Sequence, residues 1–343
     1  MIPRLALVVL ATVLAGATRA ADSRAAFLQL VDRPRVALAA EAQPPVAAGD
    51  VVEIAFSFTP EAGQRVPGIL VKSARAAASA RRPVVIALHG TGGNKESQRP
   101  FLAELARAGF VGVAIDARYH GARAQGGKNA KATEYVAAIL RTYRTGQEHP
   151  FFIDPVWDVM RLIDCLVTRD DVDPRRIGLI GFSKGGIETY LAAAVDPRIA
   201  VAVPCIGVQS FRWAMENDSW QSRIGTVQAA FDAAAKDSGV ALPGADFVRN
   251  FYDRVAPGIY GQFDGPAMLP LIAPRPLLAI NGEIDPRTPM PGLMLCAEAA
   301  RAAYRAAGAE EKFVLHIQPA TGHKVLPESM TLAREWFVRW LKP

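Results

Sequence analysis

The amino-acid sequence predicts an α/β fold, with a mostly parallel, doubly wound sheet, an N-terminal antiparallel hairpin and a helical cap insertion. Three observations predict it. From residue 84 onward, short apolar runs alternate with longer segments of helical pattern, which is typical of buried parallel strands and their connecting helices. Before residue 84, two segments alternate apolar and polar residues, and an aromatic-rich segment at residues 207–270 interrupts the later alternation.

The expected strands and helices follow directly from these patterns. Val51–Phe58 and Val66–Lys72 read as a hairpin across a Gly-containing turn. The expected parallel strands lie at residues 84–88, 111–115, 177–180, 199–203, 277–280 and 313–317. The expected helices lie at residues 96–108, 156–168, 185–195, 292–307 and 326–341, and several begin after Pro or a capping residue. Such a sheet binds its ligands at the carboxyl ends of its strands.

The aromatic-rich segment, residues 207–270, is expected to form a mainly helical lid or cap. Two interpretations of its aromatic side chains stay open, because aromatics dominate both environments: they fill a small core of their own, or they contact a substrate. The aromatics are Phe211, Trp213, Trp220, Phe231, Phe247, Phe251, Tyr252, Tyr260 and Phe263.

The N-terminus has the three-part pattern of a signal peptide. Arg4 precedes an apolar run, Leu5–Leu14, which is too short to span a bilayer comfortably. Small residues follow, so that cleavage after Ala17 or Ala20 is expected. We therefore expect residues 1–20 to be removed, residues 21–343 to form one domain, and the protein to be periplasmic or secreted, without stable membrane insertion. An uncleaved membrane anchor is the alternative.

Composition excludes several classes of protein. The chain has 343 residues, of which 50% are apolar, and a formal net charge of +6. Its basic residues are scattered, so a nucleic-acid partner is not expected. The three cysteines are widely spaced and include no CxxC pair, which argues against a metal site or a disulfide framework and favours core packing. The sequence does not predict the oligomeric state.

Ser183 is the candidate nucleophile. It lies in Gly181-Phe182-Ser183-Lys184-Gly185, after an expected strand and before an expected helix, which is the context that a G-x-S-x-G nucleophile elbow requires. The glycines permit a tight turn that projects the hydroxyl at the top of the sheet.

A serine hydroxyl needs a base to take its proton and a third group to orient the base. His323 is the candidate base, because it follows the last expected strand at the correct end of the sheet. Asp285, in the polar loop after residues 277–280, is the candidate carboxylate. Glu283 in the same loop is the runner-up, and Asp264 in the cap is a more distant alternative.

Two backbone amides are expected to hold the oxyanion of a tetrahedral intermediate. One is the amide of Lys184, whose side chain is expected to be solvated. The other comes from the loop His89-Gly90-Thr91-Gly92-Gly93, with Thr91 as first choice and Gly92 as alternative. His89 itself is expected to be structural.

A charged loop, residues 116–123, leaves the end of the next strand. It is expected either to line the pocket or to brace the oxyanion loop. Its side chains Arg118, Tyr119 and Arg123 could contact an acidic or sugar substrate, but a structural role is favoured.

These motifs resemble those of the α/β-hydrolase superfamily, and within it the branch of dienelactone hydrolases, acetylxylan esterase-like proteins and the catalytic domains of prolyl oligopeptidases. The resemblance runs from about residue 84 to the C-terminus. It implies an α/β-hydrolase fold and a Ser-His-Asp site that forms an acyl-enzyme, without a metal or cofactor. Ser183 departs from the cysteine nucleophile of dienelactone hydrolases proper. The segment before the sheet, roughly 60 residues, is too short for the propeller of a prolyl peptidase, since one blade takes about 40–45 residues.

We therefore expect an exported serine hydrolase that cleaves carboxylic esters of a small-molecule or carbohydrate-linked substrate. A serine peptidase or amidase of the prolyl oligopeptidase-like type, with the same triad, is the alternative. A non-catalytic binding module is a further alternative, which the presence of all the expected catalytic elements disfavours.

Overall fold

The structure is a computed structural model that describes residues 23–75, 81–127 and 132–342. The expected signal segment, residues 1–20, lies outside these ranges, so its structure is not described. Residues 23–31 are helical, and Phe27 and Val31, one helical turn apart, are buried.

One mixed sheet of ten strands organises the described chain, in the order β1-β3-β4-β6-β5-β7-β8-β9-β10, with β2 paired to β3. Every pair that involves β3 or β4 is antiparallel, and every pair among β5 to β10 is parallel. The predicted fold class is thus confirmed. The strands are β1 Glu41–Ala42, β2 Val46–Ala48, β3 Val51–Phe58, β4 Val66–Ser73, β5 Arg82–Leu88, β6 Val111–Ile115, β7 Val172–Phe182, β8 Ile199–Cys205, β9 Leu277–Gly282 and β10 Phe313–Gln318.

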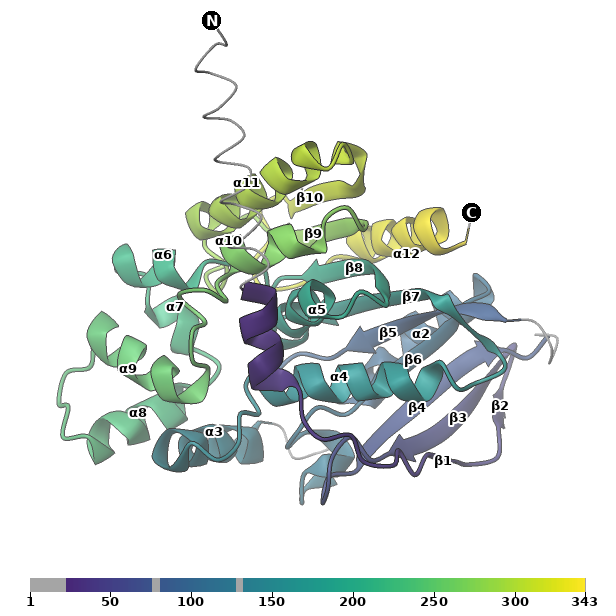
Figure 1. The fold of residues 1–343 in the computed structure, drawn as a ribbon, viewed down its shortest axis with the longest axis horizontal. Helices are drawn as coiled ribbons and strands as arrows, with labels where there is room; N and C mark the ends of the chain where they lie inside the picture. The colour runs from purple at the N-terminus through teal and green to yellow at the C-terminus, as the bar shows by residue number, and fades with distance from the viewer. Residues whose placement is uncertain (1–22, 76–80, 128–131, 343) are drawn as a thin grey trace, which may run out of the picture.

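Helices cover both faces of the sheet, as Figure 1 shows. Successive side chains of a strand point to opposite faces, so Val84 and Ile86 belong to one hydrophobic core whereas Val85 and Ala87 belong to the other. Because both faces are buried, the central strands are apolar throughout, as the sequence pattern indicated. The second core is closed by α2 Arg99–Arg107 and α12 Pro327–Leu341, and the first by α4 Ile153–Leu166, α5 Lys184–Val195 and α11 Met290–Ala306.

One predicted helix needs correction, and one helix was not predicted. The expected helix at residues 96–108 begins as a 3-10 turn, η1 Lys95–Gln98, and becomes α2 only where Pro100 occupies its first turn. The helix α3, Thr133–Thr145, was not predicted at all. Its buried side chains do follow helical spacing, at residues 135, 138, 139, 142 and 143, but apolar Val136, Ala137 and Leu140 lie between them and obscure the pattern.

The segment 207–270 is largely helical, as expected, and lies to one side of the sheet (green in Figure 1), with α3 packed against α8 and α9. Its aromatics mostly pack on one another: Phe231 contacts both Phe247 and Phe251 edge to face. Its elements are α6 Phe211–Glu216, α7 Gln221–Ile224, α8 Gln228–Asp237, α9 Ala245–Val255, α10 Gly265–Met268 and η4 Leu269–Ile272.

Two further features concern the whole described chain. Cys165, Cys205 and Cys296 are buried free thiols, in agreement with their expected packing role. Among the described residues, no helix combines the length and the apolarity that crossing a membrane requires.

Candidate active site

Three loops meet where parallel strands end. Ser183 follows β7, Asp285 follows β9 and His323 follows β10. Because β7, β8, β9 and β10 are neighbours with the same direction, their carboxyl ends lie at one edge of the sheet. Residues that are 140 positions apart in the sequence are therefore brought into contact.

The turn at Ser183 is strained and sterically crowded. Ser183 has φ 55° and ψ −113°, a backbone conformation that is unfavourable for a residue with a side chain. Glycines make the turn possible: a Cβ on Gly181 would lie 2.1 Å from the carbonyl oxygen of Gly185, and a Cβ on Gly185 would lie 2.6 Å from that of Leu88. The predicted strand-turn-helix elbow is therefore present, with α5 beginning at Lys184.

Ser183, His323 and Asp285 form one chain of hydrogen bonds. The Ser183 hydroxyl lies 2.8 Å from Nε2 of His323, and Nδ1 of His323 lies 2.7 Å from Oδ2 of Asp285. With Nδ1–H donating to Asp285, Nε2 is free to accept the serine proton. The structure thus brings together the three residues that the sequence singled out, in the order that proton transfer requires.

Asp285 is fixed by a set of donors. The amide of Arg287 donates to Oδ1 at 2.8 Å, and the hydroxyl of Thr288 donates to Oδ2 at 2.8 Å. Asn281 in turn donates to the Thr288 oxygen at 2.7 Å. Burial alone would raise the pKa of Asp285, but the hydrogen bonds from His323, Arg287 and Thr288 and the interaction with the His323 charge outweigh it and lower that pKa. Asp285 is therefore a carboxylate that accepts from His323.

The two alternative carboxylates lie elsewhere. Glu283 is exposed and accepts the backbone amide of Ala320 at 2.8 Å. Asp264 is buried in the cap, where it accepts from the Ser210 hydroxyl and from three backbone amides. Neither contacts His323.

The remaining histidines are engaged in other contacts. His149 lies beside the Val255 carbonyl oxygen, and His316 lies beside the Ser329 hydroxyl. His120 lies beside the carbonyl of Arg118, and burial together with the nearby Lys184 charge lowers its pKa to about 2.

The amides of Thr91 and Lys184 are available as donors. Neither makes a hydrogen bond within the described ranges, and both residues line the same cavity as Ser183 and His323. Gly92 is exposed and does not line that cavity, so the geometry favours Thr91 over the alternative.

The side chain of Lys184 corrects an expectation. It is buried rather than solvated, and its ammonium lies 2.7 Å from the Glu188 carboxylate one helical turn along α5. Burial raises the pKa of Glu188 despite this neighbouring cation. The ion pair lies at the start of α5, directly after Ser183. It was not predicted from the sequence, although Lys and Glu four residues apart at the start of a helix could have indicated it.

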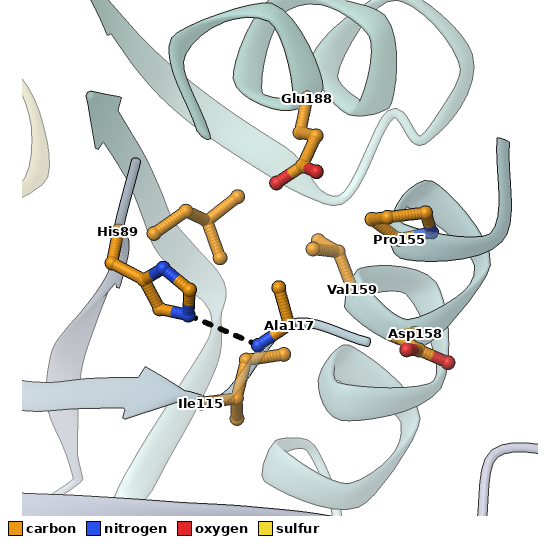
Figure 2. Close-up of a pocket in the computed structure, with 8 residues that line it drawn as sticks. His89, Ile115, Ala117, Pro155, Asp158, Val159 and Glu188 are labelled. Carbon is orange, nitrogen blue, oxygen red and sulfur yellow. Dashed lines mark hydrogen bonds between the residues drawn. The ribbon is translucent and has the colours of Figure 1, made fainter. Parts of the chain in front are cut away.

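His89 lines a small cavity close to the site. Figure 2 shows its ring on one side of this space and the Glu188 carboxylate on another, with the Ala117 amide donating to Nε2 of His89 at 3.1 Å. The other ring nitrogen, Nδ1, lies 2.8 Å from the Gly90 carbonyl oxygen. Burial, with the Lys184 charge, lowers the pKa of His89 to about 3. His89 therefore joins the oxyanion loop to the loop after β6 as a neutral side chain.

Side chains of the charged loop at residues 116–123 pair with charged residues of the framework. Asp116 accepts both the amide and the ammonium of Lys95, which follows the oxyanion loop, and so braces that loop. Arg118 is buried among Asp158, Asp154 and Glu61. Arg118 is thereby a structural cation, as the sequence favoured.

The cavity beside Ser183 encloses about 400 Å³ of space, including its open mouth. Phe151 and Phe152, before α4, line it together with Phe211 of the cap. Cap residues Ser222, Arg223 and Thr226 line it too, and so does Gln209. Sequence reasoning assigned none of these polar residues, because only the folded cap brings α7 over the strand ends. In the described ranges, no group of three or more His, Cys, Asp or Glu side chains could hold a metal ion.

Comparisons with known proteins agree with this architecture. Residues 71–308 match the profile of the fungal glucuronyl esterase family, a region that includes Ser183 and Asp285 and ends before His323. Over 180 residues the chain is 28% identical to a 4-O-methyl-glucuronoyl methylesterase of Neurospora crassa, covering 50% of this chain and 43% of that protein. The chain thus spans less than half the length of that curated relative.

Solved structures show the same fold. Acetyl xylan esterase 1 from a Thermoanaerobacterium species superimposes with a TM-score of 0.69 at 18% identity, covering 94% of this chain and 93% of that one. A glucuronoyl esterase from Solibacter usitatus superimposes with a TM-score of 0.59 at 18% identity, covering 92% of this chain and 91% of that one.

These likenesses confirm the expected resemblance to the α/β-hydrolase superfamily. The family profile covers well over half of the sequence. The chain belongs to the glucuronyl esterase family of the α/β-hydrolase fold.

Proposed function

We propose that the protein is a carboxylic ester hydrolase that acts through an acyl-enzyme on Ser183. The observation that carries this proposal is the unbroken chain of hydrogen bonds from the Ser183 hydroxyl through His323 to Asp285, at the wall of a cavity. The esterase names of the matching family and relatives support the same reaction class.

The geometry supports the following sequence of steps. His323 Nε2 takes the proton of Ser183 as the hydroxyl oxygen attacks the ester carbonyl, and the Asp285 carboxylate stabilises the imidazolium that forms. The amides of Thr91 and Lys184 donate to the oxyanion. His323 then returns the proton to the leaving alcohol, which departs and leaves the acyl group on Ser183. Water, deprotonated by His323, attacks the acyl-enzyme and releases the acid, and the proton returns to Ser183.

For the substrate we propose a carbohydrate-linked ester. Relatives named as glucuronoyl methylesterases point to the ester of a uronic acid, and a structural neighbour named as an acetyl xylan esterase points to an acetylated sugar. We also propose that residues 1–20 direct export and that residues 21–343 form the mature domain. A substrate outside the cytoplasm would be in keeping with both.

The test uses purified protein that begins at residue 21. A fluorophosphonate should label Ser183, as mapped by mass spectrometry, because it reacts with a serine activated by a base. Ser183→Ala should lose both the label and the hydrolysis of methyl glucuronate or of an acetylated xylose. Ser57→Ala, on β3 and outside the cavity, is the matched control and should retain both.

Two results would contradict the proposal. Ester hydrolysis that persists in Ser183→Ala would remove Ser183 from the reaction. Rapid cleavage of a peptide amide together with poor ester turnover would favour the peptidase alternative.

A further inference from the structure

Arg223 is a buried cation without an acidic partner. It lies on α7 of the cap, is 4% exposed, and lines the same cavity as Ser183 and His323. Its guanidinium forms no ion pair with any described Asp or Glu, and Asp264 and Asp285 act on it only through longer-range charge interactions. Burying an unpaired charge is costly, so an unpaired buried guanidinium calls for an explanation.

The other buried cations in the described ranges are paired. Lys95 lies 2.7 Å from Asp116, Lys184 2.7 Å from Glu188 and Arg118 3.0 Å from Asp158, and Arg161 pairs with Asp164. Within that set, Arg223 alone lacks a carboxylate, and it is the member in the cap wall of the active-site cavity.

The existing contacts of Arg223 orient it but do not neutralise it. Nε donates to the Ser222 hydroxyl at 3.0 Å, Nη2 donates to the backbone carbonyl of Arg287, and the guanidinium lies 5.2 Å from the centre of the Phe211 ring. Nη1 donates to no described residue. These contacts fix the planar group in place and leave donor capacity free, which is the arrangement that receives a carboxylate well.

The wall of the cavity has no acidic side chain to satisfy Arg223. Its basic members are Lys184, Arg223, Arg287 and His323. The carboxylates whose charges act on Arg223 are those of Asp264, which accepts from backbone amides of the cap, and Asp285, which accepts from His323. Burial lowers the pKa of Arg223 to about 10, which still leaves it charged at neutral pH.

A second unpartnered group lies in the same wall. Gln209 is 5% exposed, and its Oε1 atom has no hydrogen-bond partner among the described residues. An amide oxygen without a partner in the same cavity as a guanidinium can accept from a hydroxyl group of a ligand whose carboxylate binds the guanidinium, which is the pattern of an acidic sugar.

We infer that Arg223 forms the centre of an anion subsite in the active-site cavity, and that the preferred substrate carries a free carboxylate in addition to its ester group. This inference rests on the proposed function and narrows its substrate class to esters of acidic carbohydrates. Arg223 is a specificity-determining residue in this arrangement and takes no part in bond breaking.

Binding is measured separately from catalysis. The probes are D-glucuronate and D-glucuronamide, which have nearly the same shape and differ in charge. Each is titrated by calorimetry into the Ser183→Ala protein, so that the result does not depend on turnover. If the Arg223 guanidinium donates two charge-assisted hydrogen bonds to the carboxylate, glucuronate should bind about 10- to 100-fold tighter than glucuronamide.

Three variants in the Ser183→Ala background separate the roles. Arg223→Gln should reduce the ratio of the two affinities to about 1, and Arg223→Lys should restore part of it because it keeps the charge and loses the planar fork. Arg212→Gln removes the same charge from an exposed residue of α6 that does not line the cavity, and should leave the ratio unchanged.

Equal affinities for the two probes in the parent protein would overturn the inference, even where Arg223→Gln fails to fold. A preference for glucuronate that survives in Arg223→Gln would also overturn it, because the carboxylate would then bind at the oxyanion amides. Failure of the proposed function shows separately, as ester hydrolysis that does not require Ser183.

Discussion

Replacing Asp285 with Asn tests the proposed relay most directly. Asn keeps the size of the side chain and can still accept the Arg287 amide at Oδ1, which now lies 2.8 Å away. Its NH2 group would replace Oδ2, the atom 2.7 Å from His323 Nδ1. Nδ1 must then act as acceptor, so the ring proton moves to Nε2, where it blocks acceptance of the Ser183 proton.

The expected loss follows from this change of tautomer and from the loss of the carboxylate charge beside the imidazolium. In Ser-His-Asp enzymes this substitution lowers kcat about 10⁴-fold, and that factor corresponds to about 5 kcal/mol of transition-state stabilisation. KM should change little, because Asp285 lies behind His323 and does not line the cavity. The assay measures kcat and KM on methyl glucuronate, with the melting temperature as a check on folding.

Glu283→Gln is the matched control. Glu283 lies in the same loop, but it is exposed and contacts only the Ala320 amide, so its kcat should stay within about threefold of the parent. If Asp285→Asn retained kcat within tenfold of the parent while it remained folded, or if Glu283→Gln caused the larger loss, the assignment of Asp285 would be wrong.

Three further predictions concern the framework of the site. Gly181→Ala should lower kcat more than about 100-fold by displacing the elbow, because its Cβ would lie 2.1 Å from the Gly185 oxygen, whereas Gly244→Ala, with no atom within 4 Å, should be neutral in both kcat and melting temperature. Arg118→Met should lower the free energy of unfolding in urea by about 3–5 kcal/mol, because it removes the central cation of a buried cluster and leaves the carboxylates of Asp158, Asp154 and Glu61 with only Arg123 and Arg33. Arg107→Met, which breaks only the exposed pair with Asp50, should leave the free energy of unfolding nearly unchanged, and equal losses for these two variants would contradict the reasoning. The third prediction concerns pH: the pKa of His89 is about 3 in the folded protein and 6.5 in the unfolded chain, so its contribution to stability is complete above pH 6.5 and is lost as the pH falls toward 3. His89→Gln should therefore reduce the slope of unfolding free energy against pH between 6 and 4 by about 1 kcal/mol per pH unit, and an unchanged slope would show that His89 is not buried in its neutral form.

Local sequence patterns located most of the framework. The strands were predicted well because strands buried on both faces are continuous apolar runs, such as Val84–Leu88 within β5. The elbow could be recognised because its glycines are required by contacts within the elbow itself and with the adjacent strand, β5. The helix α3 was missed because apolar residues also lie outside its buried face, and because its partners, α8 and α9, lie far along the chain.

The polar contacts behind and beside Ser183 could not be predicted from local sequence patterns. The pairing of Lys184 with Glu188 and the four-residue cluster of Arg118 depend on which charged groups are buried together, and charge alone does not distinguish a buried residue from a solvated one. Nothing local marks Arg223 as different from the many exposed arginines of the chain.

The sequence by itself determined the fold class and the parallel strands of the sheet, and it singled out Ser183, Asp285 and His323 as one candidate set. Each of these depends on short-range periodicity or on a position just after a strand. Only the tertiary structure places Asp285 rather than Glu283 against His323, places Thr91 rather than Gly92 at the cavity, and shows which buried cations are paired. Those choices depend on distances of a few ångströms between segments that are far apart in the chain, and such distances are set by the packing of the cap and the helices on the sheet.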